Sequence, residues 1–121
     1  MTWRVEFHPT FAGEHAELAE TVQDELAAMV KLLQVAGPQL RRPRSDALNG
    51  SAHANMKELR FDADDGVWRV AYAFDPERKA ILLVAGDKSG GSQRKFYQGL
   101  IAKADARFDE HLAALKARRK K

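Results

Sequence analysis

The amino-acid sequence predicts a small α+β protein in the order strand, long helix, loop, three-stranded antiparallel meander and C-terminal helix. Three observations lead to this fold class. The N-terminal residues alternate apolar with polar, as in a half-buried strand. Two long segments repeat apolar residues at steps of three and four, as in amphipathic helices. Three short runs between them are separated by turn-forming residues, which predicts one sheet with the helices packed on one face.

The first strand is expected over residues 2–8, because its apolar members share one face: Trp3, Val5 and Phe7. Pro9 ends this strand. Over residues 14–36 the period changes, and apolar residues recur at helical spacing: Leu18, Val22, Leu26, Met29 and Leu33. This pattern predicts one long amphipathic helix, which stops at the pair Gly37-Pro38.

The middle of the chain is expected to form a loop and then three strands. Residues 37–55 contain prolines and a glycine with few periodic apolar positions, which indicates a loop with one helical turn at most. Strands are expected over residues 56–62, 67–74 and 80–84. The turn between the first two is Asp-Asp-Gly, and the next is Asp-Pro-Glu-Arg.

The last helix is expected over residues 93–117, after a glycine-rich loop at 86–92. Its apolar stripe is formed by Phe96, Tyr97, Leu100, Ile101, Ala104, Phe108, Leu112 and Leu115. With no internal repeat or linker, residues 1–121 are expected to form a single domain, with residues 117–121 as a basic tail.

Alternation along the strands separates an apolar face from a charged one. The apolar face, expected to be core, consists of Trp3, Phe7, Leu59, Phe61, Trp68, Tyr72 and Phe74. The other face carries Glu58, Arg60 and Arg69. Charged side chains on one sheet face, flanked by loops, indicate a candidate concave site.

Composition excludes several classes of protein. The chain is 45% hydrophobic and 31% charged, as in a globular protein, and no apolar run approaches the ~20 residues of a membrane span. The N-terminus lacks the apolar run of a signal peptide, so we expect a cytoplasmic protein. Without cysteine there is no disulfide or thiolate ligand, and the four histidines are scattered, so neither a metal site nor a cofactor is expected.

Charge is unevenly distributed although the formal net charge is only +3. Acidic residues concentrate in the first helical segment. Basic residues form three groups: Arg41, Arg42 and Arg44; Arg94 and Lys95; and Lys116, Arg118, Arg119, Lys120 and Lys121. Local positive potential of this kind is typical of domains that bind nucleic acid. Solubility and the dipole of the last helix also account for the C-terminal group.

Several short motifs follow one another in a recognisable order. They are residues 48–51, 55–61 and 66–72, a turn at 75–79, an apolar run at 81–84, Gly-Asp-Lys at 86–88 and the pair Phe96-Tyr97. In order and spacing these motifs resemble the RelE/ParE superfamily of toxins, and most closely a phage-associated, HigB-like branch. The resemblance implies a RelE-like fold and covers nearly the whole chain.

The resemblance also implies a function. Such proteins are type II toxins that cut mRNA in the decoding site of the ribosome, and their partner is a helix-turn-helix antitoxin. Two alternatives remain within the superfamily: a ParE-like toxin that inhibits DNA gyrase by binding, and an RNA-binding relative without activity.

Metal-independent RNA cleavage requires removal of the 2′-hydroxyl proton, stabilisation of a phosphorane and protonation of the departing 5′ oxygen. A guanidinium suits the second task because its planar fork matches two phosphate oxygens. Arg69 matches the arginine that family sites use on this strand, and Arg60 lies on the same expected face. The alternative is that these arginines only pair with Glu58 across the strands.

Glu58 is a candidate general base or a residue that orients the arginines. Between two guanidinium groups, we expect the pKa of its carboxyl to be lowered. Asp46 in the preceding loop and His53 are alternative bases.

The remaining candidates are basic or aromatic. Lys88 matches a basic position near the scissile phosphate in the family, or it is a solvated loop lysine. Lys57, Arg94 and Lys95 are candidates for RNA binding. Tyr97 is a further RNA-binding candidate that would stack on a base or supply a hydroxyl, with a place in the core as the alternative.

Overall fold

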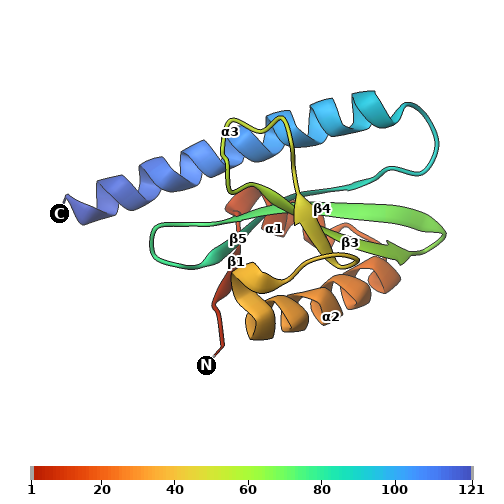
Figure 1. Ribbon diagram of the computed structural model, residues 1–121, viewed down its shortest axis with the longest axis horizontal. Helices are drawn as coiled ribbons and strands as arrows, with labels where there is room; N and C mark the ends of the chain where they lie inside the picture. Colours follow the sequence, from red (N-terminus) through yellow and green to blue (C-terminus); the bar gives the residue numbers. More distant parts are fainter. Residues whose placement is uncertain (1, 121) are drawn as a thin grey trace.

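A five-stranded sheet forms the middle layer of the molecule in the computed structural model, which describes residues 2–120 (Figure 1). The strand order is β1-β5-β4-β3-β2. The bounds are β1 Val5–Phe7, β2 Ser45–Ala47, β3 Lys57–Ala63, β4 Gly66–Phe74 and β5 Ala80–Asp87. β1 pairs with β5 in parallel, and every other pair is antiparallel. The expected α+β class and the β3–β4–β5 meander are confirmed.

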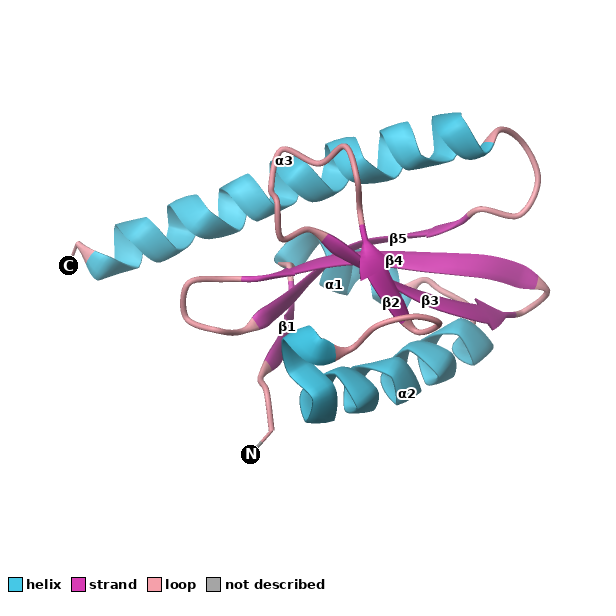
Figure 2. Ribbon diagram, viewed as in Figure 1, coloured by secondary structure: helices cyan, strands magenta, loops and turns pink. Residues whose placement is uncertain are grey.

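Helices lie on both sides of this sheet (Figure 2). Their bounds are α1 Pro9–Ala16, α2 Glu20–Ala36, the short 3-10 helix η1 Gly37–Gln39, and α3 Gln93–Arg119. At 1.5 Å per residue α3 is about 40 Å long, and its C-terminal end projects beyond the sheet (Figure 1). No helix within residues 2–120 is both long and apolar enough to cross a membrane.

The single long helix expected over residues 14–36 is wrong, because two helices occupy this region and the first begins earlier. Pro9 opens α1 instead of only ending the strand, since proline fits the first helical turn. The His8 side chain caps this helix by accepting a hydrogen bond from the Thr10 N–H at 3.1 Å. Between α1 and α2 the backbone leaves the helical conformation at Ala19.

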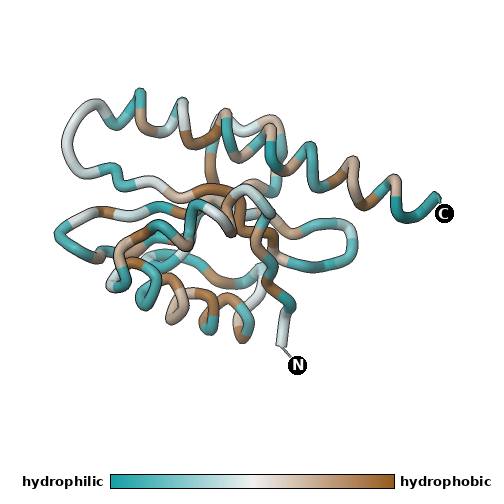
Figure 3. Tube along the Cα trace, turned by 180° about the vertical axis from the view of Figure 1, so that it is seen from behind, coloured by the Kyte–Doolittle hydropathy of each residue, from teal (hydrophilic) through white to brown (hydrophobic). Residues whose placement is uncertain are grey.

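The expectation that the helices pack on one face is also wrong. On one face, α1 and α2 cover β3, β4 and β5, with Leu26 and Leu33 packed in the same cluster as Leu59 and Leu82. On the other face, α3 covers Ala71, Ala73, Ile81 and Leu83. The physical reason is that β4 and β5 are apolar at successive positions, as in strands buried on both sides. Figure 3 shows this apolar middle layer between helices whose outer sides are hydrophilic.

The register of β3 and β4 confirms the expected alternation. Glu58 lies opposite Ala71, and Arg60 lies opposite Arg69. The apolar face is confirmed as core at Leu59, Phe61 and Tyr72, while Phe7, Trp68 and Phe74 are partly buried against it. Trp3 is half-buried and packs edge-on against Phe74.

The loop expected over residues 37–55 contains a strand that the pattern did not predict. β2 pairs with β3 and places Asp46 opposite Glu58. Three residues are too few to show a period of two, so nothing in the sequence distinguishes this segment from a loop. The strand brings the loop carboxylate to the edge of the charged face.

Candidate active site

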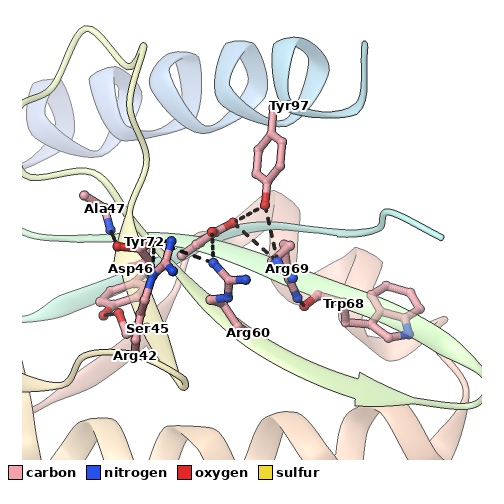
Figure 4. Close-up of polar contacts among 10 residues, drawn as sticks. Arg42, Ser45, Asp46, Ala47, Arg60, Trp68, Arg69, Tyr72 and Tyr97 are labelled. Atoms are coloured by element: carbon pink, nitrogen blue, oxygen red, sulfur yellow. Dashed lines mark hydrogen bonds and ion pairs between the residues drawn. The ribbon is translucent and has the colours of Figure 1, made fainter. Parts of the chain in front are cut away.

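A cluster of charged and phenolic side chains occupies one end of the sheet face that α3 covers. Glu58 and Arg60 are two residues apart on β3, so they point to the same face, and Arg69 projects beside them from β4. Tyr97 reaches down from α3 to meet them (Figure 4). We call these four residues the Glu58 cluster. The structure therefore brings together the three charged residues that alternation placed on this face.

Glu58 is the residue to which the other three connect. Its Oε1 accepts a hydrogen bond from the Tyr97 hydroxyl at 2.9 Å and lies 3.8 Å from the Arg69 Nε. Its Oε2 accepts from an Arg60 terminal nitrogen at 3.4 Å. Glu58 and Arg69 are only 3% and 5% exposed, so this is a desolvated ionic group and not a surface pair.

Burial raises the pKa of the Glu58 carboxyl above its ordinary value, and the Tyr97 hydrogen bond and the two arginines oppose this only in part. The expectation of a lowered pKa is therefore wrong. Adjacent guanidinium groups were visible in the sequence pattern, but the helix that removes water from the carboxyl was not. A raised pKa makes this carboxylate a stronger base than an ordinary surface glutamate.

Tyr97 links the carboxylate to Arg69 through a single oxygen. The hydroxyl donates to Glu58 and accepts from the Arg69 Nε at 3.3 Å. Arg69 also donates to the Trp68 carbonyl at 2.9 Å, which fixes the plane of the guanidinium. Burial raises the pKa of the Tyr97 phenol, so the hydroxyl keeps its proton at neutral pH.

The two alternative bases are placed less favourably. Asp46 lies 3.6 Å from Arg60 at the edge of the cluster, but its hydrogen bond from Arg42 lowers the pKa of its carboxyl. A carboxylate with a lowered pKa is a weaker proton acceptor. His53 lies away from the cluster, where its ring contacts Asp109 at 2.8 Å. Neither residue has the combination of burial and contacts found at Glu58.

A small hollow of about 290 Å³ opens beside the cluster. It is lined by Pro43, Arg44, Arg60, Phe61, Asp62 and Arg69. Three guanidinium groups and one carboxylate give this hollow the charge that a phosphate group requires. Arg44 was noted in the sequence only as a member of a basic group, because the pairing that carries it to the site is not visible as a pattern. Its carbonyl accepts the Arg60 N–H at 2.9 Å.

The other sequence candidates are distributed around this site. The Lys88 Nζ lies 6.0 Å from the centre of the Tyr97 ring, close to the cluster. Arg94 and Lys95 are exposed in the first turn of α3, and neither forms an ion pair within residues 2–120. Lys57 instead donates to the Pro38 carbonyl at 3.0 Å, on the opposite side of β3 from Glu58. The structure thus groups Lys88 with the cluster and separates Lys57 from it.

Metal ligands have no comparable grouping. Across the described part of the chain, no three histidine, aspartate or glutamate side chains are arranged to hold a metal ion. Three histidines in the same part of the chain do contact carboxylates, namely His53 with Asp109 at 2.8 Å, His111 with Asp75 at 2.8 Å and His8 with Glu110 at 3.2 Å, and all three pairs lie along the C-terminal half of α3.

Comparison with known proteins gives a consistent result. A family model described as phage-derived Gp49-like protein (DUF891) matches residues 14–109. Two candidate toxins of Mycobacterium tuberculosis are similar in sequence. HigB2 is 44% identical over 71% of this chain and 43% of its own length, and HigB3 is 46% identical over 70% of this chain and 72% of its own length.

Among solved structures, a double mutant of the E. coli toxin RelE in the free state has a similar fold. Its TM-score is 0.59 at 14% identity, and the match covers 85% of this chain and 97% of that one. At this identity the likeness concerns the arrangement of strands and helices. It confirms the RelE-like fold expected from the sequence motifs.

Proposed function

This chain belongs to the Gp49-like family of phage-derived proteins, and from that premise we propose that it is a type II toxin that cleaves mRNA on the ribosome. The HigB-like resemblance of its motifs is confirmed by the two mycobacterial relatives. The chain spans less than half of HigB2, so the full activity of that relative is part of the proposal. The observation that carries the catalytic part is the desolvated Glu58 cluster beside a hollow lined by three arginines.

The arginines are proposed to bind the scissile phosphate. Arg60 and Arg69 contribute to both the cluster and the hollow, and Arg44 adds a third guanidinium. As the 2′-hydroxyl attacks phosphorus, the non-bridging oxygens gain charge, and donors already in place stabilise that charge without reorganising. The exposed Arg44 and the partly exposed Arg60 are the groups that an approaching phosphate meets before the buried Arg69.

Glu58 is proposed to take the proton of the attacking 2′-hydroxyl. The new bond joins the 2′ oxygen to phosphorus, and the bond from phosphorus to the 5′ oxygen breaks, which leaves a 2′,3′-cyclic phosphate and a 5′-hydroxyl. The departing oxygen requires a proton, for which Lys88 is the proposed donor because its ammonium lies beside Tyr97. Tyr97 holds the carboxylate until substrate arrives.

The ribosome is the proposed source of substrate orientation. Glu58 and Arg69 are almost fully covered in the isolated chain, so a free RNA strand has little access to the base. A ribosome that holds the message in a fixed geometry bears much of the entropic cost of orienting the substrate, which the small site does not bear. We therefore expect slow cleavage of free RNA. The proposed partner that silences the protein is a helix-turn-helix antitoxin.

The test is primer-extension mapping of mRNA 5′ ends after brief expression of the chain without an antitoxin. New ends inside translated codons that disappear when translation is blocked support the proposal. Intact messages in arrested cells reject it, and a supercoiling assay on purified gyrase then tests the ParE-like alternative. Normal growth without new ends indicates an inactive relative.

A further inference from the structure

A second hollow adjoins the Glu58 cluster, and its lining differs from that of the arginine-lined hollow beside the cluster, which we call the phosphate hollow. It has a volume of about 610 Å³ and lies between the loop at residues 49–50 and the N-terminal half of α3. Its lining includes the side chains of Asn49, Gln93, Arg94, Tyr97, Gln98 and Ile101. No carboxylate is among the residues that line it. We call it the amide hollow, after its three carboxamides.

The amide hollow and the phosphate hollow meet at one contact. Arg69 lines the phosphate hollow, Tyr97 lines the amide hollow, and the Arg69 Nε donates to the Tyr97 hydroxyl at 3.3 Å. A group bound in the amide hollow is therefore a close neighbour of a phosphate bound by Arg69. In a nucleotide, the base is the group that lies close to the phosphate in this way.

The wall of the amide hollow is held in place by specific contacts. The Asp105 carboxylate on α3 accepts hydrogen bonds from the Ser51 hydroxyl and from the Ala52 N–H. Gly50 adopts a φ of +98°, which favours glycine, and a Cβ at this position would lie 3.8 Å from the Ile101 side chain. These contacts fix the loop against α3, so the hollow is preformed.

The three carboxamides of the hollow are available to a ligand. Within the part of the chain that the structure describes, the side chains of Asn49, Gln93 and Gln98 make no hydrogen bond to another residue. Each carboxamide offers donors and an acceptor side by side, which matches the edge of a nucleobase. Ile101 supplies an apolar contact, and Arg94 supplies positive charge for a neighbouring phosphate.

We infer that the amide hollow is a nucleobase subsite that holds a base of single-stranded RNA next to the scissile phosphate. This inference rests on the proposed function for the identity of its ligand, because the chemistry of the hollow alone specifies a neutral, hydrogen-bonding ring attached to an anion. Asn49, Gln93 and Gln98 are the residues that read the edge of the base.

The experiment uses the full-length ¹⁵N-labelled protein and the side-chain amide signals of asparagine and glutamine. The four ribonucleoside 5′-monophosphates are titrated separately, with ribose 5-phosphate as the probe that lacks a base. The expected result is saturable shifts of the Asn49, Gln93 and Gln98 side-chain signals that differ among the four nucleotides and are absent with ribose 5-phosphate.

Variants separate this site from general nucleotide binding. Gln98→Ala, at an exposed helical position, should weaken binding of the preferred nucleotide about three- to tenfold, as expected for one neutral hydrogen bond. Gln98→Glu keeps the shape and should weaken binding further by repelling the phosphate. Gln34→Ala, which removes a carboxamide from a hollow on the opposite sheet face, is the control and should bind as the parent does.

Each outcome has one meaning for the subsite. Shifts that are equal for ribose 5-phosphate and all four nucleotides, or unaltered affinity in both Gln98 variants, overturn it. Base-dependent binding in a chain that produces no new mRNA ends keeps the subsite and rejects the endoribonuclease. Ribosome-dependent cleavage without base-dependent amide shifts keeps the endoribonuclease and rejects the subsite.

Discussion

The two faces of strands β3 and β4 are built for different purposes from alternate residues of the same segments. Toward α2 the strands present Leu59, Val70 and Tyr72, and the Tyr72 hydroxyl is satisfied by Ser45. Toward α3 they present small apolar residues at one end and the Glu58 cluster at the other. One face thus supplies stability through apolar burial, while the other buries charge.

Burial of charged side chains lowers the stability of the folded state relative to burial of apolar side chains of the same size. Removing an ion pair from water costs several kcal/mol per ion, and well-packed apolar residues often replace such pairs without loss. Glu58 and Arg69 fill positions that face a helix, where Leu or Met would pack equally well. The α2 face therefore holds the fold together, whereas the α3 face is shaped by its chemistry. Four predictions test this division.

The largest effect is expected from Arg69→Ala. Loss of a guanidinium that is fixed before the reaction should lower ribosome-dependent cleavage about 10²- to 10³-fold. Arg69→Lys keeps the charge but loses the fork and the bond to the Trp68 carbonyl, so it should also be strongly impaired. Primer extension at equal amounts of folded protein measures both.

A matched control comes from an arginine outside the cluster. Arg4 is exposed, and within residues 2–120 its side chain pairs with Glu6 alone, so Arg4→Ala should retain toxicity. Full cleavage by Arg69→Ala would remove this residue from the mechanism and would leave the α3 face without a chemical explanation.

The next largest effect is on stability and comes from the other face. Leu26 is 1% exposed on α2, and Leu26→Ala should lower the free energy of unfolding by about 2–5 kcal/mol. Cleavage per folded molecule should not change. Urea denaturation measures the first quantity, with Leu32→Ala as the control because Leu32 lies on the same helix but is 38% exposed. Reduced cleavage by folded Leu26→Ala protein would contradict the division between the faces.

Glu58→Gln should separate the effect of this carboxyl on stability, which changes with pH, from its effect on cleavage. Burial raises the pKa of Glu58 in the folded protein, so the folded state keeps its proton at pH values where the unfolded state has lost it. Stability therefore falls as pH rises from the ordinary value of 4.5 to the raised value, by about 1.4 kcal/mol for each pKa unit of difference. The variant lacks this fall, and its cleavage should be low at every pH.

The control for this pH dependence has the opposite sign. Arg107 donates two hydrogen bonds to Glu14 and lowers the pKa of its carboxyl. Relative to Glu14→Gln, the parent should therefore lose stability as pH falls below 4.5. Urea unfolding from pH 3 to pH 8 compares the three proteins. A parent that gains stability over Glu58→Gln as pH rises would show that the arginines outweigh burial.

The smallest effect is expected from Tyr97→Phe. The change removes one hydroxyl that bonds Glu58 and Arg69 and keeps the ring, so cleavage should fall about three- to tenfold. Tyr72→Phe removes the equivalent atom from the opposite face, where it should alter stability but not cleavage. Single-round cleavage rates are measured for both variants. An equal effect of the two substitutions on cleavage would contradict the division between the two sheet faces.

Sequence patterns were sufficient for the part of the fold that depends on local periodicity. Strands β1, β3 and β4 follow from alternation, β5 from its apolar run and the last helix from apolar steps of three and four, and the same alternation placed Glu58, Arg60 and Arg69 together. The pattern did not show that helices cover both sheet faces, because apolar runs in β4 and β5 do not state which helix packs on which side.

The missing parts of the site are those created by tertiary contact. Arg44 lines the phosphate hollow just before the three-residue strand β2, and the pKa of Glu58 is raised by burial in the folded protein, against the effect of its hydrogen bond from Tyr97, almost forty positions later in the chain. Tyr97 packs in the apolar stripe of α3 and also joins the Glu58 cluster through its hydroxyl, so the sequence alternatives of a core residue and a site residue do not exclude each other. These contacts join residues far apart in the chain, so they become visible only once the strands and helices are packed together.

The length of α3 sets a distance across the molecular surface. Tyr97 stands near its start, and the basic residues Lys116, Arg118, Arg119 and Lys120 stand at its end, about 30 Å away at 1.5 Å per residue. A dinucleotide in the cluster cannot reach the basic end, whereas a folded RNA surface can touch both at once. Under the proposed function, the length of this helix therefore favours a large, structured polyanion over a short free strand.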